Sequence, residues 1–182
     1  LPSWLLATVV VLVVGVLFTG STGTPWVALL APALAGAGIA YAYGPGVDPA
    51  FELSQTMPIS DRMILLVRGL SVFGVNALLG VVASLLTGQG ALLTFGWLVP
   101  MTTVCALALA AATVARSANA GVGTALAGWA LLVMGSQAAT GQPAAAVLEV
   151  AWMPLYLIAT LLLAGVALYA SSGRRDDQPL WH

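Results

Sequence analysis

Charge is the scarcest property of this sequence. Its 182 residues include 5 Lys or Arg and 6 Asp or Glu, so that 6% of the side chains are charged. Soluble domains carry about 25% charged residues, whereas this chain is 60% hydrophobic with a mean hydropathy of +1.03. It has too little polar surface to face water on all sides. We therefore expect residues 1–182 to form a single integral membrane domain.

The residue types of most catalytic and metal sites are nearly absent. The one cysteine, Cys105, has no disulfide partner, and the one histidine is His182, the last residue. Without an internal histidine, neither a catalytic triad nor a cluster of metal ligands can be assigned. The sequence also lacks the G-x-x-x-x-G-K-[ST] phosphate loop. We expect no enzyme activity, and no metal or cofactor bound by this chain.

Clusters of positive charge are missing as well. There is no lysine, all five cations are arginines, and the net charge is −1. Nucleic-acid-binding domains and polybasic lipid-binding segments both need dense positive charge. A nucleic-acid partner is therefore excluded, whereas lipids remain expected neighbours of the apolar surface. Arginine without lysine, in a chain rich in Ala and Gly, is typical of a GC-rich bacterial genome.

Six apolar stretches are candidates for crossing a bilayer as helices, which takes about 20 residues each. Short runs of Gly, Thr, Gln and Pro separate most of them. The exception is Arg116, which alone divides two apolar runs; one helix through it would be longer than a bilayer requires. The predicted fold is all-α, with six transmembrane helices at about residues 3–19, 25–43, 63–86, 92–115, 118–137 and 150–171.

The arginines predict the orientation of these helices. If the N-terminus is cytoplasmic, then Arg62, Arg116, Arg174 and Arg175 lie inside, and none of the three outside loops contains an arginine. Cytoplasmic loops of membrane proteins are enriched in Lys and Arg. We therefore expect both termini inside, in a multi-pass protein of the bacterial plasma membrane.

Few polar side chains fall inside the predicted helices. Arg68 would lie within about 8–10 Å of the inner surface at 1.5 Å per residue. It either reaches the headgroups or pairs with a cytoplasmic carboxylate such as Glu52. Asn76 lies deeper, and we expect it to hydrogen-bond across helices. Because no carboxylate lies near the middle of a helix, a proton- or sodium-coupled carrier is disfavoured.

Small residues mark the predicted fifth helix. Gly121 and Ala125, and likewise Thr124 and Gly128, are four residues apart, a spacing that lets helices approach closely. They predict a contact either at the seam between two copies or in the core, with Trp129 packed between helices. The alternative is that they reflect only the Ala-rich composition.

The longest polar segment joins the second and third predicted helices. Gly44-Pro45-Gly46 ends one helix, and Asp48-Pro49 begins another, with Asp as N-cap and Pro in the first turn. Met57-Pro58 ends it, because the residue before proline disfavours helix. The segment predicts a short cytoplasmic helix over about residues 48–56.

Six spans with this acidic helix resemble the permease subunit of type-2 ABC exporters. The resemblance lies in Glu52, Leu53, Thr56 and in the opening of the next span, Pro58, Ile59, Ser60 and Arg62. In that family the short helix is a coupling helix, which docks on a cytoplasmic ATPase subunit that binds ATP and Mg²⁺. The resemblance implies that the docking residues here are Asp48, Phe51, Glu52, Leu53, Gln55 and Thr56.

The same resemblance implies further features. Short re-entrant helices are expected outside the membrane between spans five and six, at Gln142–Pro154, and a second permease copy or a related permease would complete the export path. The apolar lining would suit a hydrophobic or amphipathic substrate.

A second resemblance supplies an alternative function. The run YGPGVDPAFELSQTMPIS is similar to an actinobacterial membrane domain that follows a zinc-binding anti-sigma module and is encoded beside ABC-transporter genes. This implies a membrane-anchored regulator or sensor with a permease-like fold. It would bind a sigma factor through a module upstream of Leu1.

Overall fold

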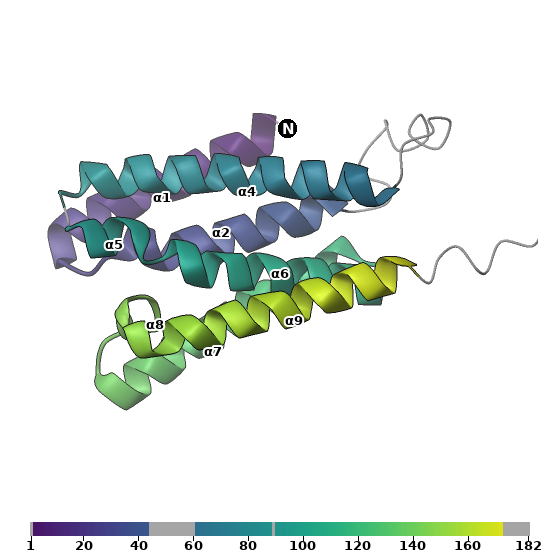
Figure 1. Cartoon of the computed structure of the whole chain (residues 1–182). Coiled ribbons are helices and arrows are strands. Elements are labelled where there is room, and N and C mark those ends of the chain that lie inside the picture. Colours follow the sequence, from purple (N-terminus) through teal and green to yellow (C-terminus); the bar gives the residue numbers. More distant parts are fainter. Residues whose placement is uncertain (1, 44–60, 89, 173–182) are drawn as a thin grey trace, which may run out of the picture.

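The computed structural model describes residues 2–43, 61–88 and 90–172, and every regular element in these ranges is a helix (Figure 1). Short elements join the long helices: α5 (Ala91–Phe95), α8 (Ala145–Leu148) and the 3₁₀ helix η1 (Val150–Trp152). The long helices are α1 (Pro2–Thr22), α2 (Trp26–Tyr43), α4 (Asp61–Leu86), α6 (Leu98–Ala115), α7 (Ala118–Thr140) and α9 (Met153–Ser172).

Five described segments are long and apolar enough to cross a membrane, which makes this an all-α, multi-pass membrane protein by length and composition. They are Trp4–Thr22, Gly69–Leu86, Ala91–Ala115, Ala118–Thr140 and Val150–Ala170. The predicted crossing at residues 25–43 corresponds to α2, whose described apolar part, Trp26–Tyr41, is shorter than these five.

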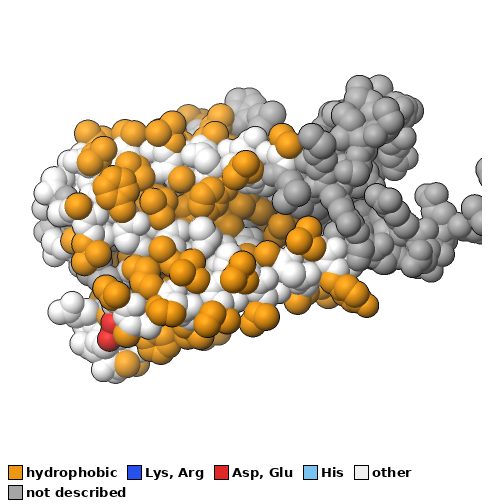
Figure 2. Space-filling model, in the orientation of Figure 1, with side chains coloured by type: hydrophobic (Ala, Val, Ile, Leu, Met, Phe, Trp, Pro, Cys, Tyr) orange, Lys and Arg blue, Asp and Glu red, His pale blue; other side chains and the backbone are white. Residues whose placement is uncertain are grey.

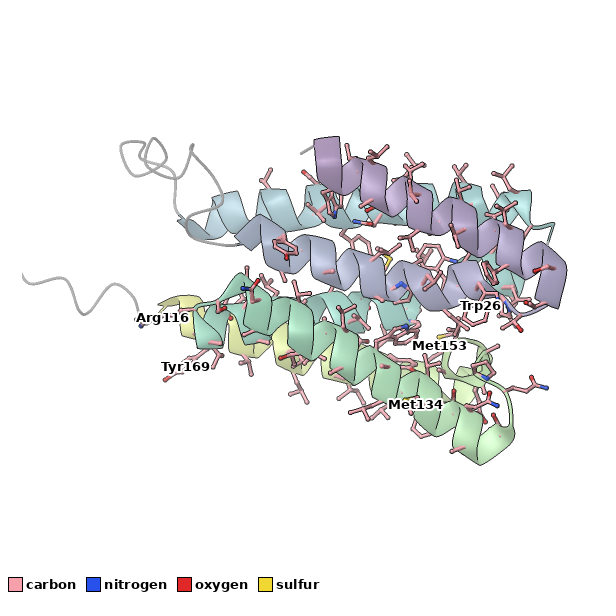
Figure 3. The ribbon with its side chains drawn as sticks, turned by 180° about the vertical axis from the view of Figure 1, so that it is seen from behind. Trp26, Arg116, Met134, Met153 and Tyr169 are labelled. Atoms are coloured by element: carbon pink, nitrogen blue, oxygen red, sulfur yellow. The ribbon has the colours of Figure 1, made fainter. Side chains whose placement is uncertain are left out.

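The long helices run alternately between two ends of the bundle (Figure 1). The α6–α7 turn at Arg116, the end of α2 and the start of α4 lie at one end, here called the Arg116 end. The α1–α2 and α4–α5 turns lie at the opposite end with α8, here called the α8 end. Figure 3 shows the same division, with Arg116 and Tyr169 far from Trp26 and Met153.

Two neighbouring helices, α2 and α6, form the centre of the bundle. α2 contacts α1, α4, α6 and α7, and α6 contacts α7 and α9 as well. Their inward side chains are almost entirely buried; Ala35 and Ala40 of α2 and Met101 and Ala108 of α6 are all 0% exposed. The outer helices instead present apolar side chains to their surroundings, and these are spread over the described part of the face shown in Figure 2.

One face of α7, with Gly121 and Ala125, is directed to this centre, whereas Thr124 is exposed. A Cβ atom on Gly121 would lie 2.7 Å from the Ala108 carbonyl oxygen, 2.8 Å from the Ala112 Cβ and 2.9 Å from the Ala40 Cβ. Ala125, one turn on, is 0% exposed. Of the two positions predicted from the sequence for this face, a seam between copies or the core, the Gly121 face therefore lies in the core. It is the joint of α2, α6 and α7 within one chain.

The α6–α7 turn has a local cause. Arg116 ends α6 in the left-handed region (φ 52°), and its N–H bonds to the Ala112 carbonyl. Ser117 then caps α7, its hydroxyl oxygen accepting a hydrogen bond from the Ala120 N–H at 3.4 Å. Capping serines satisfy the first N–H groups of a helix, which have no partner within it. This break was predicted from the sequence and is confirmed.

Candidate functional site at the α8 end of the bundle

The predicted ATPase-docking residues, Asp48 to Thr56, lie outside the described residues. What the structure describes is their flanks: α2 ends at Tyr43 and α4 begins at Asp61, both at the Arg116 end. The side chain of Arg68 is outside the described part of the chain as well. A candidate site can therefore be described only at the α8 end of the bundle.

Asn76 is buried in α4, with 3% of its surface exposed. The sequence predicts a hydrogen bond across helices for this amide. Its Nδ2 instead donates to the Val72 carbonyl of α4 itself, at 2.8 Å. This donor is thus bonded to the preceding turn, a local arrangement that hydropathy and spacing do not distinguish from a contact with a neighbouring helix.

The chain between α7 and α9 folds back onto the bundle. α7 ends at Thr140 and is followed by Gly141, whose φ of 71° suits glycine, and Pro143 precedes the single turn of α8. Ala144, Ala146 and Val147 are buried. Two short helical elements, α8 and η1, therefore lie within the stretch 142–154, where the sequence predicts short re-entrant helices.

Two side-chain hydrogen bonds hold α8 in place. The Tyr156 hydroxyl of α9 donates to the Ala146 carbonyl at 2.8 Å, and the Ser136 hydroxyl of α7 lies 3.2 Å from the Pro143 carbonyl. A helix of one turn leaves most of its carbonyls without partners inside it. Tyr156 thus satisfies one carbonyl of α8 from α9, and Ser136, whose hydroxyl also lies 2.9 Å from the Val133 carbonyl of α7, approaches the start of this segment from the other side.

We expect Tyr156→Phe to loosen α8 without unfolding the bundle. Removing the hydroxyl leaves the buried Ala146 carbonyl unpaired, at a cost of about 1 kcal/mol. Hydrogen–deuterium exchange should become faster over residues 142–152 and stay unchanged in α2 and α6. Tyr41→Phe, at an exposed position near the other end, is the control. Equal exchange in both variants would show that the Tyr156 hydroxyl does not hold α8.

Next to α8, the predicted span 92–115 is broken in two. Pro100 is the third residue of α6, where its missing N–H costs no helical bond, but a helix continued from α5 would drive its ring against the Gly96 carbonyl. The first backbone bond of α6 runs from the Met101 N–H to the Trp97 carbonyl at 3.0 Å. The chain bends at Gly96, where a Cβ atom would lie 2.5 Å from the Leu92 carbonyl oxygen and 3.7 Å from that of Val147 in α8.

Trp97 fills the space inside this break. Its side chain is 0% exposed, and a Cβ atom on Gly80 of α4 would lie 2.4 Å from its Cη2. Among the described residues, its Nε1 is the one buried side-chain nitrogen or oxygen without a hydrogen-bond partner. An unpaired donor in a protein interior costs about 1–3 kcal/mol.

A cluster of threonine hydroxyls connects α6 to α9, soon after the break in the sequence. Thr160 Oγ1 lies 3.2 Å from Thr102 Oγ1 and 2.9 Å from Thr103 Oγ1, and both Thr103 and Thr160 donate to the Tyr156 carbonyl. Every hydroxyl in the cluster thus has a partner. Such bonds join transmembrane helices because no water is present to satisfy them.

The charge of the α8 end comes from Glu149, the only charged side chain described besides Arg116. Glu149 is exposed, and Trp152 Nε1 donates to its Oε2 at 3.0 Å. Among the described residues, no group of three His, Cys, Asp or Glu side chains gathers in a way that would hold a metal ion. The described part of the α8 end therefore offers hydrogen-bond donors and carbonyls in apolar surroundings.

Sequence reasoning missed the break at Gly96–Trp97 and the hydroxyl cluster. The signal for the break was Pro100, inside an otherwise uninterrupted apolar run, and the pair Thr102-Thr103 was a signal for the cluster. When the chain is compared with protein-family models, curated proteins and solved structures, it matches none of them. Its function is therefore inferred from its own residues and geometry.

Proposed function

We propose that this chain is the transmembrane subunit of an ABC-type exporter, with six spans and both termini in the cytoplasm. It forms part of the path for a hydrophobic or amphipathic substrate. A second copy, or a related permease, forms the rest of the path. A separate ATPase subunit, which binds ATP and Mg²⁺, supplies the energy.

The observation that supports this proposal most strongly is that two connections of the bundle lie at its opposite ends. α8 and η1 lie between α7 and α9, where the resemblance implies short outer helices. The segment that carries the coupling-helix residues begins after Tyr43 and ends before Asp61, and both of these positions lie at the Arg116 end (Figure 1). An exporter that is driven by a cytoplasmic ATPase subunit needs its docking segment on the cytoplasmic side and the exit of its export path on the opposite side.

The distribution of charge supports the same orientation. Arg116 lies exposed in the α6–α7 turn at one end, whereas the described charge of the other end is the acidic Glu149. Positive residues are enriched on the cytoplasmic side. The Arg116 end then faces the cytoplasm, together with Arg62 at the start of α4.

The proposal is tested by reversing the charge of Glu52. With the tagged chain purified from native membranes, we expect Glu52→Arg to retain about tenfold less of an ABC ATPase subunit than the unchanged chain, because a reversed charge at a docking surface repels its partner. Asp177→Arg, after α9 in the sequence, is the matched control and should retain the ATPase.

Each outcome of this purification has a defined meaning. Undiminished ATPase binding and turnover in Glu52→Arg would contradict the docking assignment. Recovery of a sigma factor and no ATPase with the unchanged chain would favour the alternative, a membrane-anchored regulator. Aggregation of Glu52→Arg before it reaches the membrane would show that Glu52 pairs within its own chain.

A further inference from the structure

The N–H of Trp97 is a buried donor that the fold itself leaves unused. The indole is 0% exposed and its Nε1 has no hydrogen-bond partner. Trp129, also buried, shows the usual arrangement: its Nε1 donates to the Leu29 carbonyl at 2.7 Å. Buried tryptophans normally find such a partner. A phenylalanine would offer Gly80 an apolar ring without the unpaired donor, so packing alone does not explain the N–H of Trp97.

Further donors follow Trp97 directly in the chain. Trp97 is the residue before α6, and no side chain caps that helix start. The N–H groups of Leu98 and Val99 precede the first helical hydrogen bond of α6, which begins at Met101. The start of an 18-residue helix also carries a partial positive charge. A broken membrane helix of this kind presents donors where a continuous helix would present none.

We propose that Trp97 Nε1 and the start of α6 bind the carbonyl oxygen of an ester or amide within a largely apolar molecule. The surroundings favour a neutral acceptor over an anion. No positively charged side chain is described at the α8 end, where the described charge is the acidic Glu149, and desolvating an anion without a counter-charge is costly. Such a carbonyl comes either from a membrane lipid or from a free apolar ligand.

Binding requires α8 to move. The indole is fully covered, and the Val147 carbonyl of α8 lies against Gly96, the residue before Trp97. A ligand reaches the donors only in the fraction of molecules in which α8 has moved away from Gly96. The apparent affinity for the ligand scales with that fraction. Loosening α8 by Tyr156→Phe should therefore tighten binding. This proposal concerns binding alone and holds whether the chain exports a substrate or regulates a partner.

The test uses the full chain in nanodiscs made of ether-linked phosphatidylcholine, which lacks ester carbonyls, with N-methyldecanamide as the added carbonyl probe. The amide should raise the melting temperature of the unchanged chain and of Tyr156→Phe, with the larger rise in Tyr156→Phe. It should leave the melting temperature of Trp97→Phe unchanged. Decane, which has no carbonyl, is the control probe. An equal rise for Trp97→Phe and the unchanged chain would overturn the proposal.

The indole proton of Trp97 reports the bond directly. Its ¹H–¹⁵N resonance is assigned as the one that Trp97→Phe removes, and the resonance of Trp129, whose N–H is already bonded, is the internal reference. A downfield shift in ester-linked relative to ether-linked phosphatidylcholine supports the proposal with lipid as the source of the carbonyl. A shift only on addition of N-methyldecanamide supports it with a free ligand. A resonance that moves in neither case overturns it.

Discussion

Gly121→Leu should unfold or strongly destabilise the helix bundle, by about 3 kcal/mol or more, at the upper end of what overpacking costs. The Cβ atom alone would lie 2.7 Å from the Ala108 carbonyl oxygen, 2.8 Å from the Ala112 Cβ and 2.9 Å from the Ala40 Cβ. None of these is the flexible end of a side chain. α7 would have to move away from both α2 and α6, which are the two central helices.

The same helix provides the control for this substitution. Gly123 is exposed, and no atom lies within 4 Å of the position its Cβ would take. Gly123→Leu adds the same side chain to α7 and should leave the melting temperature in detergent within a few degrees of the unchanged chain. If both variants melt alike, α7 does not join α2 and α6 through its Gly121 face. If Gly121→Leu keeps its melting temperature and loses only its oligomeric state, that face is a seam between copies.

The sequence predicted most helix boundaries because their signals are local. Gly, Thr and Pro mark the turns at residues 20–25 and 139–143, and Arg116-Ser117 supplies a helix end and a cap within two residues. These residues act through φ, capping and missing donors, which depend only on their neighbours in the chain. Such features are readable without knowing what the helices pack against.

The break before α6 escaped prediction because the run 92–115 has no charged residue and is apolar enough as a whole to cross a membrane. Hydropathy records whether a segment suits the membrane, and α5, α6 and the turn between them all do. The break follows from Pro100, and Gly96 permits the close approach of the Leu92 carbonyl, which a Cβ atom would meet at 2.5 Å. A proline inside a predicted span indicates such a break only if its backbone geometry is considered.

The placement of the small residues of α7 required the structure for a different reason. Gly121 and Ala125 permit a close helix contact, but the same spacing serves a contact within one chain or between two. The difference lies on the partner helices, where Ala40, Ala108 and Ala112 are small as well. Because no local rule pairs residues that are far apart in the sequence, the sequence predicted a close contact without identifying its partner.

The contact between Trp129 and α2 depends on a second proline. Pro32 lies inside α2, is fully buried and has no N–H for the carbonyl of Ala28, four residues before it. The carbonyl of Leu29 belongs to the same turn of α2. Trp129 Nε1 donates to the Leu29 carbonyl at 2.7 Å from α7. The indole thus donates to a backbone carbonyl in the proline-containing turn, in surroundings where no water replaces such a bond.

Trp129→Ala should therefore cost about 3–5 kcal/mol, the range for removing a large buried aromatic side chain. Trp129→Phe keeps most of the ring but leaves the Leu29 carbonyl without its indole donor, so it should cost about 1–3 kcal/mol. Trp97→Phe, at an equally buried site whose Nε1 has no partner, is the matched comparison and should cost less than Trp129→Phe. The measurement is the free energy of unfolding in detergent for the three variants. If Trp129→Phe is as stable as Trp97→Phe, the hydrogen bond across helices contributes nothing, and α2 keeps its shape at Pro32 without it.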